Sequence, residues 1–390
     1  MSRTASVLTL PVSALRPGMF VLAIVRQLGQ KEVATSGYLN SEQQIAELVA
    51  MGVQTVQICP TRSRKSTEQQ VASEDSPQEK CRSEGNTLKI KRLYSEAREL
   101  QEKLLSQLKQ GEPIDVGPLA EVAEEMVDTM FTHGDAMLCL ARIRAKDAYL
   151  MEHSMNVAIL LANFGRYLGI ERAILKELTL GGLLHDVGKI MTPNAILNKP
   201  GKLTDEEFAI MREHVVHSRE ILGQTPGITP VMLEVASHHH ERMDGSGYPL
   251  GLSGDQLSLY SRMSAIVDVY DAVTADRVYK QGLQPTQAFR ILLKGAADHF
   301  DGILVNQFIK CLGVYPVGTL VLLSNQRLAL VIERNAEQPL KPKVKVFYHA
   351  TARHYLDVKV LDLAKAGCSD TIESVVEPRD YGIELEPFIG

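Results

Sequence analysis

The sequence predicts a mainly helical protein with a small mixed α/β domain at its N-terminus and a short β-rich appendage at its C-terminus. Apolar residues in the central part recur at spacings of three and four, as in Ile174, Leu178, Gly181 and Leu184. That spacing is typical of α-helices that pack on a core. Short runs rich in β-branched residues stand near both ends of the chain. A chain of 390 residues is long enough to bury more than one such core.

The composition is that of an ordinary globular protein, with 45% hydrophobic and 23% charged residues. A formal net charge of −5 argues against binding to a nucleic-acid polymer, although a small anionic ligand needs only a few local cations. We find no uncharged apolar run of membrane-spanning length and no signal-peptide core at the N-terminus. Five scattered cysteines without a CxxC pair indicate reduced thiols, so we expect a cytoplasmic protein.

Residues 1–60 are predicted to form the small mixed domain. The Arg16-Pro17-Gly18 stretch predicts a turn between its first two strands. Its expected elements are strands at Val7–Val12, Met19–Leu28 and Val53–Ile58 and a helix between Ser41 and Gly52. Residues 61–87 are polar and poor in aromatic residues, which predicts a solvated linker and a domain boundary.

Residues 88–316 are predicted to be helical. A stripe of apolar residues follows one side of the first helix, at Leu93, Ala97, Leu100, Leu104 and Leu108. This stripe either forms a short coil that makes a homodimer or packs on the next part of the chain, and its short length favours packing. Two more helices are expected near Leu119–Phe131 and Ala136–Arg144. The helices of residues 88–135 are expected to precede the catalytic region.

Histidines and aspartates then appear at core-facing positions of the predicted helices. His153 lies in register with Val157 and Leu160, and His185-Asp186 ends the stripe that contains Leu178. Asp268 lies in an almost wholly apolar helix. A buried carboxylate costs several kcal/mol unless a hydrogen bond or a cation satisfies it. A structural hydrogen bond explains an isolated His–Asp pair as well as a metal ion does.

Two later helices extend this set. A capping box at 204–207 begins a helix with His214 and His217, and another helix ends in His238-His239-His240. The resulting nitrogen- and oxygen-rich set, without sulfur, suits Fe, Mn or Zn in an open hydrolytic site. Its members are His153, His185, Asp186, His214, His239, His240 and Asp268. This is more than one ion needs, so we expect Asp186 to bridge two ions.

From Val317 the hydrophobic period changes to two. Strands are expected at Gly318–Ser324, Ala329–Glu333 and Val344–Tyr348. Residues 317–390 are therefore predicted to form the short β-rich appendage and tail.

Four motifs together resemble an HD-GYP domain, a branch of the HD metal-dependent phosphohydrolases. They are His153-Ser154, His185–Lys189, His239–Pro249 and Asp268–Ala272, within a match of about residues 140–316. The segment Val12–Pro60, with the motif Leu15-Arg-Pro-Gly-Met19, is similar to a domain of unknown function that often precedes HD-GYP domains. The resemblance implies an HD-type all-α helical bundle that hydrolyses cyclic di-GMP, a bacterial second messenger, with a metal-activated hydroxide.

The resemblance also implies roles for individual residues. The seven candidate ligands would hold two divalent ions, Fe or Mn, because Tyr149 stands where some family members have a glutamate for a third ion. Asp186 and Lys189 would be catalytic, with Lys189 on the scissile phosphate. Arg277 and Lys280 fall where the family binds phosphates or guanine. Gly247, Tyr248 and Pro249 would shape the loop over the site and serve signalling partners. His217 and His238 are expected not to be ligands, and Ser218 replaces the usual glycine.

The implied reaction opens cyclic di-GMP to linear pGpG, to GMP, or to both. 3′,3′-Cyclic GMP-AMP is the alternative substrate, because no motif fixes the loop contacts that recognise the base. A second hypothesis is a non-catalytic adaptor that binds partners through the Gly247-Tyr248-Pro249 loop. Degenerate members lose ligands, whereas this chain keeps all seven. A third, an HD-type hydrolase of nucleotide monophosphates or triphosphates, is disfavoured by the same loop motif.

Overall fold

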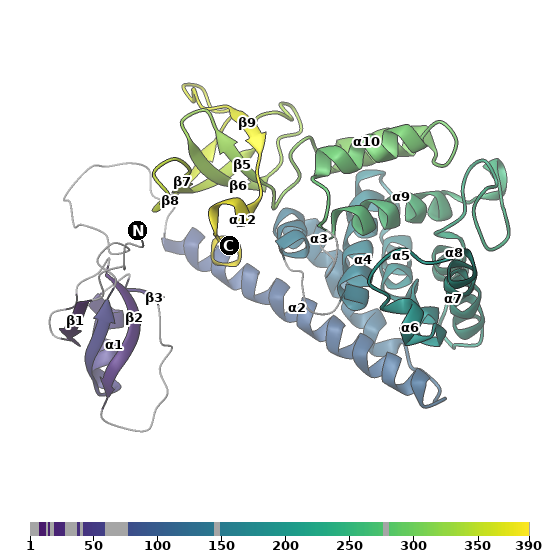
Figure 1. The fold of residues 1–390 in the computed structure, drawn as a ribbon, viewed down its shortest axis with the longest axis horizontal. Helices are drawn as coiled ribbons and strands as arrows, with labels where there is room; N and C mark the ends of the chain where they lie inside the picture. The colour runs from purple at the N-terminus through teal and green to yellow at the C-terminus, as the bar shows by residue number, and fades with distance from the viewer. Residues whose placement is uncertain are drawn as a thin grey trace. The chain divides into compact units, whose positions relative to one another are not determined.

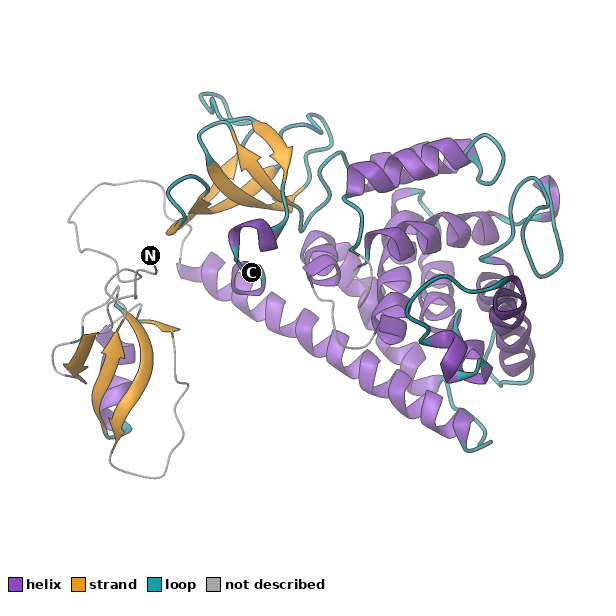
Figure 2. Ribbon diagram, in the orientation of Figure 1, coloured by secondary structure: helices purple, strands orange, loops and turns teal. Residues whose placement is uncertain are grey.

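The computed structural model describes residues 8–12, 15, 19–27, 37–39, 42–58, 77–143, 149–275 and 281–389. Contacts within the chain define two compact units, Met1–Asp75 and Ser76–Gly390. We describe each unit by itself. Figure 1 gives the positions of the elements along the chain, and Figure 2 shows that strands occur in the N-terminal unit and near the C-terminus.

The first unit is a four-stranded antiparallel sheet with one helix. Its elements are β1 (Leu8–Pro11), β2 (Phe20–Gln27), β3 (Gly37–Tyr38), α1 (Glu42–Ala50) and β4 (Val53–Ile58), with strand order β1-β4-β2-β3. Val21, Ile45 and Val56 are buried together in a core of its own. This confirms the predicted mixed domain, while Ser41 and the turn at residues 16–18 lie outside the described residues.

The second unit begins with the long helix α2 (Pro77–Lys109). The helix starts inside the stretch 61–87 where the sequence predicts a linker, and residues 59–76 lie outside the described residues. The apolar stripe of α2 is used within the chain, because Leu93, Ala97 and Leu104 are buried in the same core as the helices that follow. The domain limits expected from the sequence stay predictions.

The next helix, α3 (Gly117–Ile143), covers both of the helices expected between Leu119 and Arg144. It remains continuous across a kink at His133, whose φ of −139° and ψ of 37° are not helical. Gly134 follows this kink and is buried. The sequence therefore places the break correctly but does not show that one helix continues through it.

The remaining helices form the bundle that carries the candidate ligands. They are α4 (Tyr149–Tyr167), α5 (Arg172–Leu184), the 3₁₀ turn η2 (Val187–Met191), α6 (Asn194–Leu197), α7 (Asp205–Gly223), α8 (Pro230–His238), η3 (Gly254–Gln256), α9 (Leu259–Thr274), α10 (Pro285–Gly295) and α11 (Gly302–Leu312). The predicted capping box is confirmed at the start of α7, where the Glu207 amide donates to Thr204 Oγ1 and Glu207 accepts from the Thr204 amide. Large side chains such as Phe164 and Phe308 fill the core of the bundle.

A five-stranded antiparallel sheet follows the bundle. Its strands are β5 (Leu320–Leu323), β6 (Arg327–Glu333), β7 (Lys343–His349), β8 (His354–Asp362) and β9 (Ile372–Val375), in the order β8-β7-β6-β5-β9. The chain ends in α12 (Pro378–Tyr381) and η4 (Glu386–Phe388). This confirms the β-rich appendage, although β8 and β9 were not predicted.

No helix among the described residues combines the length and the apolar character that a bilayer crossing requires. The thiols of Cys139, Cys311 and Cys368 are free.

Candidate metal centre

The seven candidate ligands come together from five parts of the bundle. His153 lies in α4, His185 and Asp186 follow α5, and His214 lies in α7. His239 and His240 follow α8, and Asp268 lies in α9. All of them are buried except His240, which is partly exposed. Polar side chains that are far apart in the sequence thus cluster in one buried site.

Close packing of α4 against α5 brings the first two histidines together. A Cβ at Gly182 would lie 2.7 Å from the Ala158 Cα, so only glycine permits this approach. The rings of His153 and His185 are consequently 5.2 Å apart between centroids. Gly182 in the apolar helix α5 therefore allows His153 and His185, the first two candidate ligands, to lie next to each other.

Asp186 lies at the middle of the cluster, with each carboxylate oxygen near a different pair of imidazoles. Its Oδ2 is 3.6 Å from His153 Nε2 and 3.4 Å from His185 Nε2. Its Oδ1 is 3.3 Å from His214 Nε2 and 3.8 Å from His239 Nε2. This is the arrangement of a carboxylate that can be shared by two cations.

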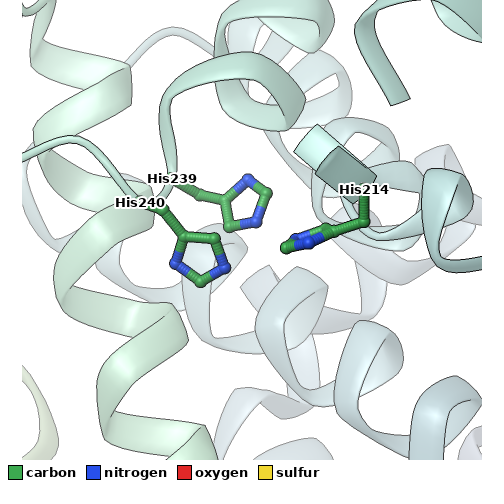
Figure 3. Close-up of side chains that lie close together, drawn as sticks. All are labelled: His214, His239 and His240. Carbon is green, nitrogen blue, oxygen red and sulfur yellow. The ribbon is translucent and has the colours of Figure 1, made fainter. Parts of the chain in front are cut away.

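The remaining ligands complete two groups around Asp186. Asp268 Oδ1 is 3.0 Å from His153 Nε2, and Asp268 Oδ2 is 3.6 Å from His240 Nδ1. The donor atoms of His153, His185 and Asp268 lie within 4.8 Å of one another, and so do those of His214, His239 and His240. Figure 3 shows the rings of this second group facing one another. Each group has a size suited to one metal ion.

Hydrogen bonds to the backbone fix the tautomers of three histidines. The Nδ1 atoms of His185, His214 and His239 lie 2.7, 2.6 and 3.0 Å from the carbonyl oxygens of Gly182, Met211 and Ala236. Because a carbonyl only accepts, each Nδ1 must carry the proton, and each Nε2 then presents a lone pair to the cluster. This is how metal-ligating histidines are commonly oriented.

Unpaired acceptor atoms at the centre fit a cation. Among the described residues, His185 Nε2, Asp186 Oδ1, His214 Nε2 and His239 Nε2 are buried without a hydrogen-bond partner. Burial lowers the pKa of His185 and His239, and it lowers the pKa of His240 to about 3, so these rings are neutral. Buried lone pairs that face one another repel unless a positive ion lies between them. The donor set therefore fits divalent metal ions.

Lys189 and His153 offset part of the negative charge of the buried carboxylates. Burial opposes ionisation of Asp186, but the nearby positive charge of Lys189 holds its pKa well below the usual value. Burial likewise opposes protonation of His153, yet hydrogen bonds to Asp268 and Asp271 raise its pKa to about 10. The site is thus built around net negative charge that a metal ion can neutralise.

Asp271 is a residue of this centre that the sequence analysis did not single out. Its Oδ2 accepts a hydrogen bond of 2.7 Å from His153 Nδ1, and the carboxylate is buried. It therefore orients His153 and makes the imidazole a stronger ligand. Its position three residues after Asp268 was a signal that could have identified it.

We expect Asp271→Asn to weaken metal binding by about 10- to 100-fold, because an amide cannot stabilise positive charge that develops on His153. The dissociation constant can be measured by titration of Mn²⁺ against a competing chelator. Asp298→Asn, an exposed change, is the control. An unchanged dissociation constant for Asp271→Asn would rule out the orienting role.

Gly188 and Ser218 hold η2 against α7. The Gly188 amide donates to Ser218 Oγ at 2.8 Å, and that hydroxyl donates to the His185 carbonyl at 2.9 Å. A Cβ at Gly188 would lie 2.1 Å from the His214 carbonyl oxygen. Ser218 therefore fills a structural role with its hydroxyl, and Gly188 allows Asp186 and His214 to approach.

Gly188→Ala is expected to push η2 away from α7 and to cost about 1–3 kcal/mol of unfolding free energy, because the obstructing atoms are backbone. Metal affinity should fall as well, since Asp186 and His214 lie on the two separated elements. Urea denaturation and metal analysis of the purified protein measure the two effects. Gly223→Ala, at a position where a Cβ meets open space, should show neither.

Lys189 and the loop that follows α8 border the centre. Lys189 Nζ forms an ion pair with Asp186, and its side chain is 17% exposed. The buried Glu241 carboxylate accepts hydrogen bonds from the amides of Leu250 and Leu252 at 2.7 and 3.0 Å, which fastens the loop. The Tyr248 ring lies 4.7 Å from His240, between centroids. Gly247 and Pro249 flank Tyr248 in this loop and are half-buried.

Other residues considered in the sequence lie elsewhere. His217 is 3.8 Å from Glu220, and His238 Nδ1 lies 3.1 Å from Ser261 Oγ, so neither belongs to the grouped donors. Arg277 and Lys280 lie outside the described residues, as does the side chain of Tyr149.

Comparisons with known proteins identify related domains along the chain. Residues 138–304 match the HD domain family, residues 8–119 match a domain of unknown function (DUF3391), and residues 320–382 match a KOW domain associated with the HD domain. The fold is similar to that of an HDG"Y"P protein from Bdellovibrio bacteriovorus, with a TM-score of 0.50 at 14% identity. That match covers 78% of this chain and 98% of the other.

Two relatives are named for the substrate on which they act. The chain is 40% identical over 262 residues to a cyclic di-GMP phosphodiesterase of Pseudomonas aeruginosa, a match that covers 67% of this chain and 63% of the relative. It is 41% identical over 157 residues to a 3′,3′-cGAMP-specific phosphodiesterase of Vibrio cholerae, covering 40% of this chain and 36% of the relative. The chain thus spans less than two thirds of the length of either.

The fold and the buried His/Asp clusters define an HD-domain protein with a centre suited to metal ions. More particularly, the chain is related to the HD-GYP cyclic di-GMP phosphodiesterases, with DUF3391 before the HD domain and a KOW domain after it.

Proposed function

We propose that the chain is a metal-dependent phosphodiesterase that hydrolyses cyclic di-GMP. One water adds across one phosphodiester to give linear pGpG, and a second water gives two molecules of GMP. The observation that carries the proposal is the position of Asp186, whose two oxygens face separate imidazole pairs. A shared carboxylate between two ligand groups is the feature that two-ion hydrolysis at phosphorus requires.

The ligand assignment follows from the two groups. His153, His185 and Asp268 would hold one ion, and His214, His239 and His240 the other, with Asp186 shared. Two divalent ions, Fe or Mn, would supply Lewis-acid activation of water and charge stabilisation at the phosphate. The described residues offer no thiolate among these donors.

The chain's own residues orient and balance the charges around the phosphate. Lys189 lies at the partly exposed side of Asp186, where its ammonium group can stabilise negative charge that builds on the phosphate oxygens. Burial keeps the imidazoles of His185 and His239 neutral, and hydrogen bonds to backbone carbonyls direct their Nε2 atoms to the centre. Gly247, Tyr248 and Pro249 border the substrate, and Arg277 and Lys280 contribute phosphate or guanine contacts. The same loop, where Leu250 is 54% exposed, is also available to signalling partners.

A panel of substrates tests the proposal. Protein loaded with Mn²⁺ or, without oxygen, with Fe²⁺ is incubated with cyclic di-GMP, 3′,3′-cyclic GMP-AMP and 3′,5′-cyclic GMP, and the products are separated by chromatography. We expect pGpG or GMP from cyclic di-GMP and no turnover of the cyclic mononucleotide. Protein that holds about two metal ions per chain but hydrolyses none of the dinucleotides would contradict the proposal.

3′,3′-Cyclic GMP-AMP is the second candidate substrate. The Vibrio cholerae relative named for this substrate is as similar over its matched part as the cyclic di-GMP relative. The two substrates differ in one base, so the ratio of kcat/KM values on the same preparation separates them.

A further inference from the structure

A row of aromatic rings leads from the metal centre to the surface. The His240 ring is 4.7 Å from the Tyr248 ring, and the Tyr248 ring is 6.3 Å from the Phe208 ring, between centroids. His240 and Tyr248 are partly exposed, and Phe208 at the outer end of the row is 46% exposed. A ligand that reaches the metal centre from this side therefore passes Tyr248 and Phe208.

Phe208 is not needed for the packing of α7. The residues that α7 buries are His214, Val215, Ser218 and Leu222, and Phe208 takes no part in the apolar core. Its ring instead contacts Tyr248 edge-on, with an interplanar angle of 84°. Phe208 is 46% exposed in spite of its contacts with Tyr248 and Arg212, so part of its ring surface is available to a flat ligand.

Arg212 stands one helical turn after Phe208 and supplies a positive charge. Its guanidinium carbon is 5.4 Å from the Phe208 centroid and 5.8 Å from the Tyr248 centroid. These contacts hold the guanidinium by cation–π attraction. No described carboxylate lies within ion-pair distance of it, so its charge is available to an anion.

We propose that Phe208, Tyr248 and Arg212 form a base platform, which holds one purine of the cyclic dinucleotide while a phosphodiester lies at the metal centre. This inference rests on the proposed function. Aromatic faces beside cations bind bases by stacking and neighbouring phosphates by charge. Phe208 stacks on the purine, and Arg212 neutralises the phosphate that is not being hydrolysed.

The platform is expected to contribute to substrate affinity. Stacking does not depend on the identity of the base, because every base has a π-face. The platform therefore contributes affinity for both cyclic di-GMP and 3′,3′-cyclic GMP-AMP. Since Phe208 lies away from the metal ligands, its contribution belongs to substrate binding and not to the hydrolytic step.

Steady-state kinetics of Phe208→Ala with the Mn²⁺-loaded full chain test the platform. We expect KM for the cyclic dinucleotide to rise by roughly tenfold, the typical value of a lost base–aromatic contact, with kcat within about twofold. Phe208→Trp should restore the original KM. Val216→Ala is the matched control, because Val216 is 38% exposed on the same helix and lies outside the platform.

Arg212→Gln provides a second test through charge. We expect a several-fold higher KM and a weaker dependence of KM on salt concentration, because one phosphate contact is lost. Arg219→Gln removes an exposed arginine from the same helix and should change neither quantity. Equal effects of the two arginine variants would show general electrostatic attraction and would overturn the role of Arg212.

Binding of GMP, which has a base, and of inorganic phosphate, which has none, tests this inference independently of the proposed function. GMP and inorganic phosphate are titrated into the Mn²⁺-loaded protein by calorimetry. The platform predicts that Phe208→Ala weakens GMP binding and leaves phosphate binding unchanged, whether or not cyclic dinucleotides are hydrolysed. Wild-type hydrolysis together with an unchanged KM in Phe208→Ala would overturn the platform and leave the function standing. Without wild-type hydrolysis, the proposed function fails, and unchanged GMP affinity in Phe208→Ala would overturn the platform as well.

Discussion

Asp186→Ala should abolish both metal binding and turnover, with kcat falling by roughly four orders of magnitude, as happens when a central catalytic group of a hydrolase is removed. Both oxygens of Asp186 face imidazole pairs, so its loss takes a donor from each candidate ion at once. The substitution also leaves Lys189 without its ion-pair partner. Metal content by mass spectrometry and hydrolysis of cyclic di-GMP are measured on the same preparation.

His217→Ala is the matched control for that variant. His217 is on α7, as His214 is, but its side chain is 32% exposed and is near Glu220. We expect it to keep its metal and nearly all of its activity. Asp186→Ala protein that retained two ions per chain would show that the shared-carboxylate assignment is wrong, and a large loss in His217→Ala would show that the ligand set is wrong.

Lys189→Ala should lower kcat by about 10²- to 10³-fold while the metal ions stay bound. The lysine offers no lone pair to a metal while it is charged, and its ammonium group lies beside Asp186 at the exposed side of the cluster. Its removal takes away positive charge that the transition state at phosphorus needs. Once ions occupy the centre, they balance Asp186 without the lysine.

Metal content again separates the outcomes for this lysine. Normal metal content with reduced kcat supports the phosphate role. Loss of metal in Lys189→Ala would instead mean that the lysine organises the cluster through Asp186. Lys199→Ala, which removes a lysine paired with Glu207 outside the cluster, controls for loss of a surface charge.

The candidate ligands could be predicted because each is a polar residue at an apolar position. Asp268 lies among Ile266, Val267 and other buried residues of α9, where an unpaired carboxylate would be costly. His153 is likewise a polar residue buried among apolar residues of α4. Such contradictions between residue type and helical position can be read directly from a sequence. The structure brings all seven residues together.

The residues that support the centre could not be predicted in this way. Gly188 matters because the His214 carbonyl oxygen lies where its Cβ would be, and that contact is made between separate elements. Asp271 looks like an ordinary residue near a helix end until His153 is placed beside it. Phe208 occupies the first turns of an amphipathic helix, where a single exposed aromatic residue is common.

The missed strands and helix limits have a similar explanation. β8 is an edge strand with mostly exposed residues, so it lacks the run of buried residues that β6 and β7 have. α2 extends back to Pro77 through a sequence whose polarity resembles that of a linker. Polarity alone does not distinguish a solvated helix from a solvated coil, since both lack an apolar stripe.

The candidate ligands come from five separate parts of the bundle between His153 and Asp268, so bound metal ions would hold these parts together. Unfolding would release them, so loading raises the free energy of unfolding by about 2.7 kcal/mol for each ion when free metal is at a hundred times its dissociation constant. The melting temperature should therefore rise with added Mn²⁺ and fall with a chelator. A thermal denaturation curve would then report the metal occupancy of the centre before any substrate is tested.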